Sequence, residues 1–112
     1  MVKRFRKRYV LYRVLCENDG VGKGSVRKAI YESFFRFFGF LGLSQARLMF
    51  IDYNENEKMG ILACSHRFLE LVRVSLALIS QIDGKKVNIY TVRVSGTIKS
   101  LREFKARIAR KT

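Results

Sequence analysis

Three residues carry side chains that commonly act as nucleophiles, bases or metal ligands: Cys16, Cys64 and His66. Their spacing matches no structural zinc pattern, because the chain has neither a CxxC pair nor a second histidine. His66 is also the only histidine that could serve as a base, and no motif such as GxSxG marks a nucleophile for it. We therefore expect no catalytic residue and no metal site here, and we expect His66 to support the start of a helix.

A second group that could hold a divalent ion consists of Asp52, Glu55 and Glu57. These acids surround segment 54–57, whose composition predicts a hairpin turn, where Asp, Asn and Glu are common for local backbone bonding. Their spacing is not that of an EF-hand or a comparable loop. The sequence thus predicts that the chain itself binds no metal and no other cofactor.

The glycines of segment 20–25 precede an expected helix, as they would in a phosphate-binding loop. The segment fits neither GxGxxG nor GxxxxGK followed by Ser or Thr. We interpret it as a flexible connection between a strand and a helix.

Charge is distributed unevenly along the chain, which has 112 residues and a net charge of +14. Residues 1–13 contain six bases and no acid, and residues 85–112 contain nine bases and one acid. The 71 residues between them contain eight of each sign. Because all the excess charge lies at the two ends, we expect a polyanionic partner, with nucleic acid favoured over an anionic membrane or an acidic protein.

Hydrophobic periodicity and turn residues predict one domain, 1–112, of the α+β class. We expect strands at 8–17, 46–53, 58–65 and 86–95. We expect helices from Ser25 to a stop at Gly39 and Gly42, over 66–82, and from a Thr97 cap to about 110. This order predicts a ferredoxin-like or RRM-like βαββαβ antiparallel sheet with an added basic C-terminal helix.

In that topology the first and last strands are antiparallel neighbours, so Arg8 should lie beside Ser95 and Gly96. The two basic ends of the chain would then form one RNA-binding surface. Its predicted members are Lys3, Arg4, Arg6, Lys7, Arg8, Lys99, Arg102, Lys105, Arg107, Arg110 and Lys111.

The expected third strand, 58–65, is aliphatic and lacks the aromatic residues on which an RNA-recognition motif stacks bases. The terminal helix has an apolar stripe of Ile98, Leu101 and Ile108, which should cover part of this sheet face. We therefore expect contacts to RNA phosphates with little base readout.

Phenylalanines are concentrated in the first helix, more densely than one helical face can bury. Part of the cluster should be core and the remainder a protein interface. The candidate interface residues are Phe34, Phe35, Phe37, Phe38 and Phe40.

Three segments carry a family resemblance: residues 8–11 (RYVL), 61–74 (ILACSHRFLELVRV) and 92–99 (VRVSGTIK). They are similar to the small protein subunits shared by ribonuclease P and ribonuclease MRP, whose archaeal form is ribonuclease P protein component 2. The chain ends after its basic helix without an acidic tail, which favours the archaeal form.

The resemblance implies a subunit of the ribonucleoprotein that removes 5′ leaders from precursor tRNA. In that family the RNA holds the catalytic site with magnesium ions, and the subunit pairs with ribonuclease P protein component 3 and works with other ribonuclease P proteins. A homodimer contact is a further possibility that the sequence leaves open.

Alternatives of other classes are a general structured-RNA-binding or ribosome-associated protein, a small ferredoxin-like hydrolase such as an acylphosphatase, and a membrane-surface protein. This sequence lacks the anion-binding loop that such a hydrolase would need. The terminal helix has too narrow an apolar stripe for binding to a membrane surface. We expect an intracellular, cytoplasmic protein without membrane contact, in which Cys16 and Cys64 are reduced.

Overall fold

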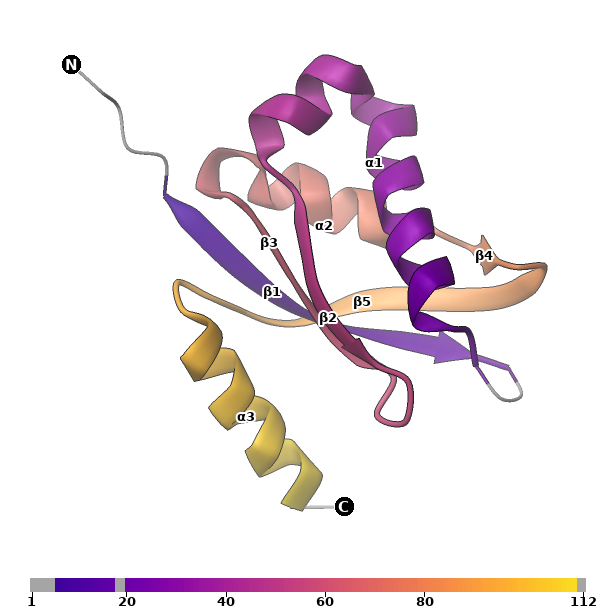
Figure 1. The fold of residues 1–112 in the computed structure, drawn as a ribbon, viewed down its shortest axis with the longest axis vertical. Coiled ribbons are helices and arrows are strands. Elements are labelled where there is room, and N and C mark those ends of the chain that lie inside the picture. Colours follow the sequence, from indigo (N-terminus) through magenta and orange to yellow (C-terminus); the bar gives the residue numbers. More distant parts are fainter. Residues whose placement is uncertain (1–5, 18–19, 111–112) are drawn as a thin grey trace.

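The computed structural model describes residues 6–17 and 20–110, without the side chains of residues 109 and 110 (Figure 1). The strands are β1 (Lys7–Cys16), β2 (Met49–Asn54), β3 (Met59–Ser65), β4 (Gln81–Ile82) and β5 (Lys85–Ser95). The helices are α1 (Lys23–Ala46), the short 3-10 turn η1 (His66–Phe68), α2 (Leu69–Ala77) and α3 (Ile98–Arg110).

The strands form one antiparallel sheet in the order β2-β3-β1-β5-β4. The central strand β1 pairs with β3 on one side and with β5 on the other. This arrangement confirms the predicted ferredoxin-like topology. Two register shifts interrupt the pairing, between Leu11 and Tyr12 of β1 against β5 and between Phe50 and Asp52 of edge strand β2 against β3.

Each face of the sheet is covered by a different set of helices (Figure 1). Alternate residues of a strand point to opposite faces, and β1 supplies both. Val10, Tyr12 and Val14 join the main core, to which α1 and α2 contribute. Leu11 joins a smaller core on the other face, with Leu101 of α3. The predicted cover of one sheet face by the terminal helix is therefore confirmed.

The prediction that Gly39 and Gly42 end the first helix is confirmed in part, because the backbone at Gly39 (φ 70°, ψ −173°) is non-helical and interrupts the helix. A second helical segment of α1 follows this kink, where the positive φ suits glycine, and it runs through Gly42 to Ala46. Residues beyond the bend, Leu43 and buried Ala46, pack against the main core. This packing outweighs the low helix propensity of the two glycines. As a result β2 begins at Met49 rather than at residue 46.

The helix predicted over 66–82 is shorter in the structure. It consists of η1 and α2, and the chain then forms the two-residue strand β4. Asp83 and Gly84 both have positive φ, 53° and 76°, as a tight two-residue hairpin between β4 and β5 requires. Burial of Ile82 in the main core favours this hairpin over further helix.

The two predicted helix caps had different outcomes. The structure confirms Thr97, whose Oγ1 accepts a hydrogen bond from the Ser100 N–H at 3.3 Å. It does not confirm Ser25, because α1 begins two residues earlier, at Lys23, with Gly22 in the cap position.

Candidate nucleic-acid interface

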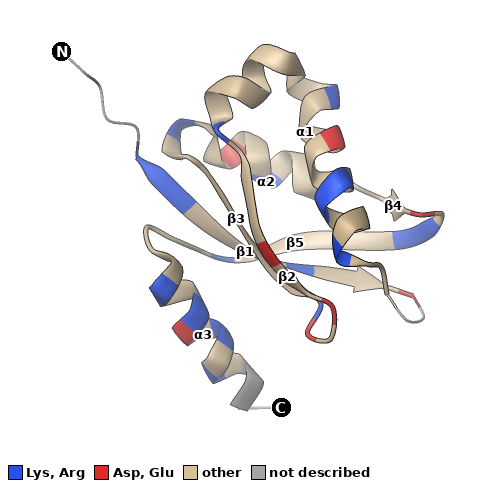
Figure 2. Cartoon of the chain, in the orientation of Figure 1, with Lys and Arg blue, Asp and Glu red and all other residues tan. Residues whose placement is uncertain are grey.

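The two basic ends of the chain meet where β1 begins and β5 ends. Tyr9 of β1 pairs with Ser95 of β5. A Cβ atom added to Gly96 would lie 3.7 Å from Nη1 of Arg8, so the Arg8 guanidinium group lies against this backbone. The predicted proximity of Arg8 to Ser95 and Gly96 is thus confirmed. Figure 2 shows the basic start of β1 and the basic helix α3 on the same side of the molecule.

The start of β1 is fixed by backbone hydrogen bonds. The Arg6 carbonyl oxygen accepts a hydrogen bond from the His66 N–H at 2.6 Å, and Lys7 pairs with Ser65 at the end of β3. Arg6 and Lys7 are exposed, while Arg8 is half-buried. The predicted RNA-binding residues Lys3 and Arg4 lie outside the described residues.

Helix α3 presents its apolar side to the sheet. Leu101 is fully buried, and Phe104 and Ile108 pack around it against β1 and β3. Phe104 is a member of this contact that the predicted stripe omitted. The opposite side of α3 therefore faces solvent.

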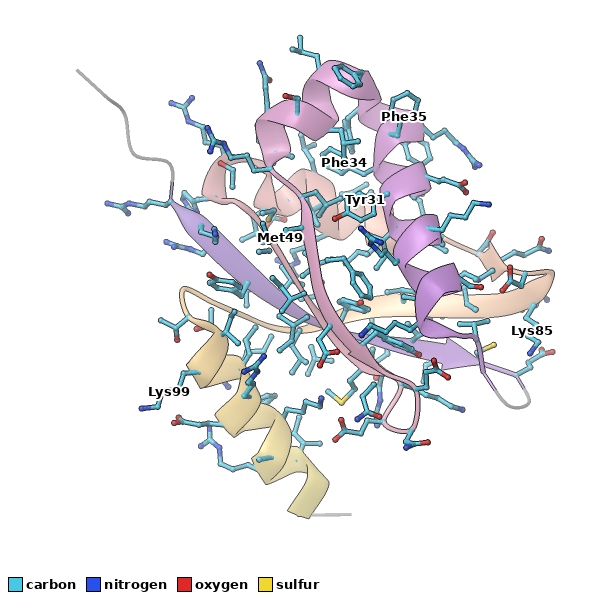
Figure 3. The ribbon with its side chains drawn as sticks, in the orientation of Figure 1. Tyr31, Phe34, Phe35, Met49, Lys85 and Lys99 are labelled. Atoms are coloured by element: carbon cyan, nitrogen blue, oxygen red, sulfur yellow. The ribbon has the colours of Figure 1, made fainter. Side chains whose placement is uncertain are left out.

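Three predicted RNA-binding residues of α3, Lys99, Arg102 and Arg107, are exposed. Figure 3 shows Lys99 directed away from the sheet. Arg110 belongs to α3, but its side chain is not described, and Lys111 lies outside the described residues. The structure thus brings several of the predicted cations into one region and leaves their contact with RNA as a prediction.

Lys105 is in a different environment from the other α3 cations. Its side chain is only 19% exposed, and its Nζ lies 2.7 Å from Oε1 of Glu57 in the turn between β2 and β3. This ion pair ties α3 to the hairpin. Lys105 therefore has a structural partner within the chain, in addition to its predicted role.

Arg93 of β5 extends the basic surface from α3 onto the sheet. Its guanidinium carbon lies 4.5 Å from the centre of the Phe104 ring, and that of Arg107 lies 5.8 Å from the same ring. Cations at such distances are attracted to an aromatic face. Arg93 is not among the predicted site residues. Strict alternation from Val92, which packs in the core beside α3, would place Arg93 on the other face; the register shift between β1 and β5 brings it opposite Leu11 instead.

The phenylalanine cluster divides into buried and exposed members. Phe34 is fully buried in the main core, so its assignment to an interface is wrong; Phe38 is partly buried against the same core. Phe35 and Phe37 are each 49% exposed and Phe40 is 77% exposed. Figure 3 shows Phe34 turned towards the interior and Phe35 away from it. The exposed members stay candidates for a protein interface.

The acids of the β2–β3 hairpin are engaged in local bonds. Asp52 accepts a hydrogen bond from the Tyr53 N–H at 2.8 Å and pairs with Lys23 at 3.6 Å. Glu55 accepts a hydrogen bond from the Lys23 N–H at 3.1 Å. Within residues 6–17 and 20–110, no three His, Cys, Asp or Glu side chains are placed to share a metal ion.

The two cysteines are free thiols, as expected. Burial raises the pKa of Cys64 from 9.0 to about 11, so this thiol stays protonated and unreactive near neutral pH. His66 is exposed in η1, immediately before α2.

Fold and surface together define a small basic α+β protein, with a sheet covered on both faces and cations gathered at one side. The Rpp14/Pop5 family model matches residues 8–106. The chain belongs to the Rpp14/Pop5 family, which confirms the resemblance seen in the sequence.

Curated relatives are similar over most of their length. The chain is 35% identical to ribonuclease P protein component 2 of Pyrococcus abyssi over 100 residues, which cover 89% of this chain and 84% of the relative. It is 36% identical to the protein of that name in Pyrococcus furiosus over 99 residues, covering 88% and 82%. It is 30% identical to the one in Aeropyrum pernix over 106 residues, covering 93% and 86%.

A solved structure shares the fold. One chain of the cryo-EM structure of yeast ribonuclease MRP superposes with a TM-score of 0.67, covering 99% of this chain and 100% of that chain at 13% identity. No helix in the described ranges combines the length and apolarity needed to cross a membrane.

Proposed function

We propose that this chain is a protein subunit of ribonuclease P that supports the catalytic RNA in removing 5′ leaders from precursor tRNA. The observation that carries the proposal is the family match over residues 8–106, together with relatives named ribonuclease P protein component 2. The meeting of the two basic ends supports it, because a subunit of a ribonucleoprotein needs such a surface.

The subunit acts by neutralising phosphate charge. Lys and Arg side chains displace the counterions of RNA and allow its helices to pack closely. Helix α3 covers the sheet face on which other proteins of this topology stack bases, which favours contact through the RNA backbone along this side. The RNA, held in its active shape, binds the magnesium ions of the reaction.

The chain contributes no reacting group in this proposal. Three features support that: the exposed position of His66, the raised pKa of Cys64, and the local bonds of Asp52 and Glu55. The exposed phenylalanines around the bend of α1 contact a protein partner, with ribonuclease P protein component 3 or a second copy of the chain as candidates.

The test is a reconstituted cleavage assay with precursor tRNA, ribonuclease P RNA and the partner proteins, with and without this chain. We expect cleavage at moderate magnesium to depend on the chain, and added magnesium to replace it in part, because both supply positive charge to the RNA. Polylysine at equal positive charge is the control for non-specific neutralisation.

Two results would contradict the proposal. Cleavage that is unchanged by omission of the chain would leave a structured-RNA-binding protein of another particle. Full replacement by polylysine would mean that the fold adds nothing to charge alone.

A further inference from the structure

A hollow of about 690 Å³ opens where the end of α1 and the start of α2 meet the end of β3. Its location is away from α3, and the residues of the predicted RNA-binding set do not line it. The lining residues are Ser44, Gln45, Arg47, Ser65, Arg67, Phe68 and Leu71.

The walls of the hollow are basic. Arg47 and Arg67 are both exposed, and the described lining contains no acid. Arg67 takes part in none of the salt bridges formed among the described residues. An arginine guanidinium group presents a fork of N–H donors that matches phosphate oxygens, so a hollow lined by two arginines is suited to bind a phosphate.

Apolar and neutral polar groups complete the surface. Phe68 is partly buried and packs on the main core, and Leu71 is 37% exposed. Gln45 adds an amide that can donate and accept hydrogen bonds. A hollow with aromatic and aliphatic surface beside two arginines suits a base or a sugar as well as a phosphate, and bases are accessible in this way only where RNA is unpaired.

The hollow lies next to the basic start of β1. The hydrogen bond from the His66 N–H to the Arg6 carbonyl oxygen joins the residue before Arg67 to that segment. Lys7 lies opposite Ser65, which lines the hollow. In Figure 2 the blue segments at the end of α1, at η1 and at the start of β1 lie on one side of the molecule. An RNA strand that follows the start of β1 therefore reaches the hollow directly.

We propose that this hollow binds an unpaired RNA nucleotide, with its phosphate on Arg47 and Arg67 and its base or sugar against Phe68 and Leu71. The proposal rests on the RNA-binding part of the proposed function and not on which RNA is bound. It adds two arginines from the central part of the chain, whose charges sum to zero in the sequence, to a surface otherwise built from the chain ends.

The first test compares two fluorescent RNA probes by anisotropy: a hairpin with an unpaired uridine loop, and its stem as a blunt duplex. The test variant combines Arg47→Asn, chosen because Asn tolerates the φ of 50° at this position, with Arg67→Gln. The control, Arg27→Gln with Arg36→Gln, removes the same charge from two exposed arginines of α1 that do not line the hollow.

We expect the test variant to lose about tenfold in affinity for the hairpin, and the slope of log affinity against log salt to fall by about 0.7, as the loss of one single-strand phosphate contact would give. The duplex should be affected no more than by the control variant. Equal losses for hairpin and duplex, or for test and control variants, would overturn the proposal.

A second test uses the unaltered chain, so that no variant needs to fold. Photoreactive 4-thiouridine in the hairpin loop should crosslink to the tryptic peptides 37–47, 59–67 or 68–73, which carry the lining residues. Crosslinks confined to other peptides would overturn the site. If the chain supports precursor-tRNA cleavage but fails both tests, the proposed function stands and only the proposed nucleotide site is rejected.

Discussion

At the scale of single residues, Gly60 determines how the main core is packed against β2. Tyr12 of β1 crosses over Gly60 of β3, and its ring stacks on that of Tyr53 with the centroids 6.3 Å apart. A Cβ atom on Gly60 would collide with the Tyr12 side chain and would lie 2.6 Å from the Asp52 carbonyl oxygen. The backbone part of that collision cannot be relieved by rotating a side chain.

Gly60→Ala should therefore lower the free energy of unfolding by about 1–3 kcal/mol, the usual cost of overpacking a core. Urea unfolding followed by circular dichroism measures this. Gly24→Ala is the matched control, because an added Cβ there meets no atom within 4 Å. A Gly60→Ala protein as stable as the control would mean that β2 shifts freely on β3.

At the scale of elements, helix α3 carries exposed cations that are predicted to contact RNA and one cation that pairs with the β2–β3 hairpin. Arg102 is exposed, whereas Lys105 is paired with Glu57 and only 19% exposed. Arg102→Ala should reduce the slope of log affinity against log salt by about 0.9, the value for one duplex phosphate contact. It should change the free energy of unfolding by no more than about 0.5 kcal/mol, as for other surface substitutions.

Lys105→Ala should show the opposite pattern, with a loss of about 0.5–1 kcal/mol in unfolding free energy for the broken ion pair and a smaller change in salt slope. Anisotropy with an RNA duplex at several NaCl concentrations, together with urea unfolding, separates the two effects. Equal changes of slope in both variants would show that Lys105 leaves Glu57 to contact RNA.

The order of the elements could be predicted from the sequence, because the alternation of apolar residues in strands and their spacing in helices indicate which side chains are buried. The deviations have local causes. Gly39 does interrupt the first helix, but packing of Leu43 and Ala46 on the main core favours a further helical segment after it. Asp83-Gly84 is a strong hairpin signal, yet β4 has only two residues and too little alternation to be recognised before the fold is known. Lys105 and Arg93 could not be assigned, because their partners Glu57 and Phe104 are distant in sequence.

At the scale of the whole molecule, the core beneath α1 and α2 contains buried phenol and thiol groups, those of Tyr12 and Cys64 among them. Burial raises the pKa of Tyr12 well above its usual range, with smaller effects from Tyr53 and Asp52, and raises that of Cys64 from 9.0 to about 11. The folded chain thus holds both protons more tightly than the unfolded chain does. Its stability from these groups is complete below pH 9 and is lost as the pH rises further.

We expect the free energy of unfolding, measured by urea titration at a series of pH values, to fall between pH 9 and 11. Cys64→Ala should flatten this decline in part, because Tyr12 still contributes. A decline that Cys64→Ala does not alter would mean that the thiol reaches solvent in the folded chain.

The irregular pairing of β2 affects how the chain behaves at high concentration. A long, regular edge strand is a template on which other chains add strands and aggregate. Here the edge strand β2 has six residues, with a register shift between Phe50 and the charged Asp52, and at the opposite edge the two-residue β4 pairs only with Lys85 and Lys86 of β5. The β2 edge therefore offers no continuous row of free backbone groups, whereas among the described residues no strand pairs with the outer side of β5 beyond Lys86. Strand addition by a second copy of the chain is therefore expected at the outer side of β5 and not at β2.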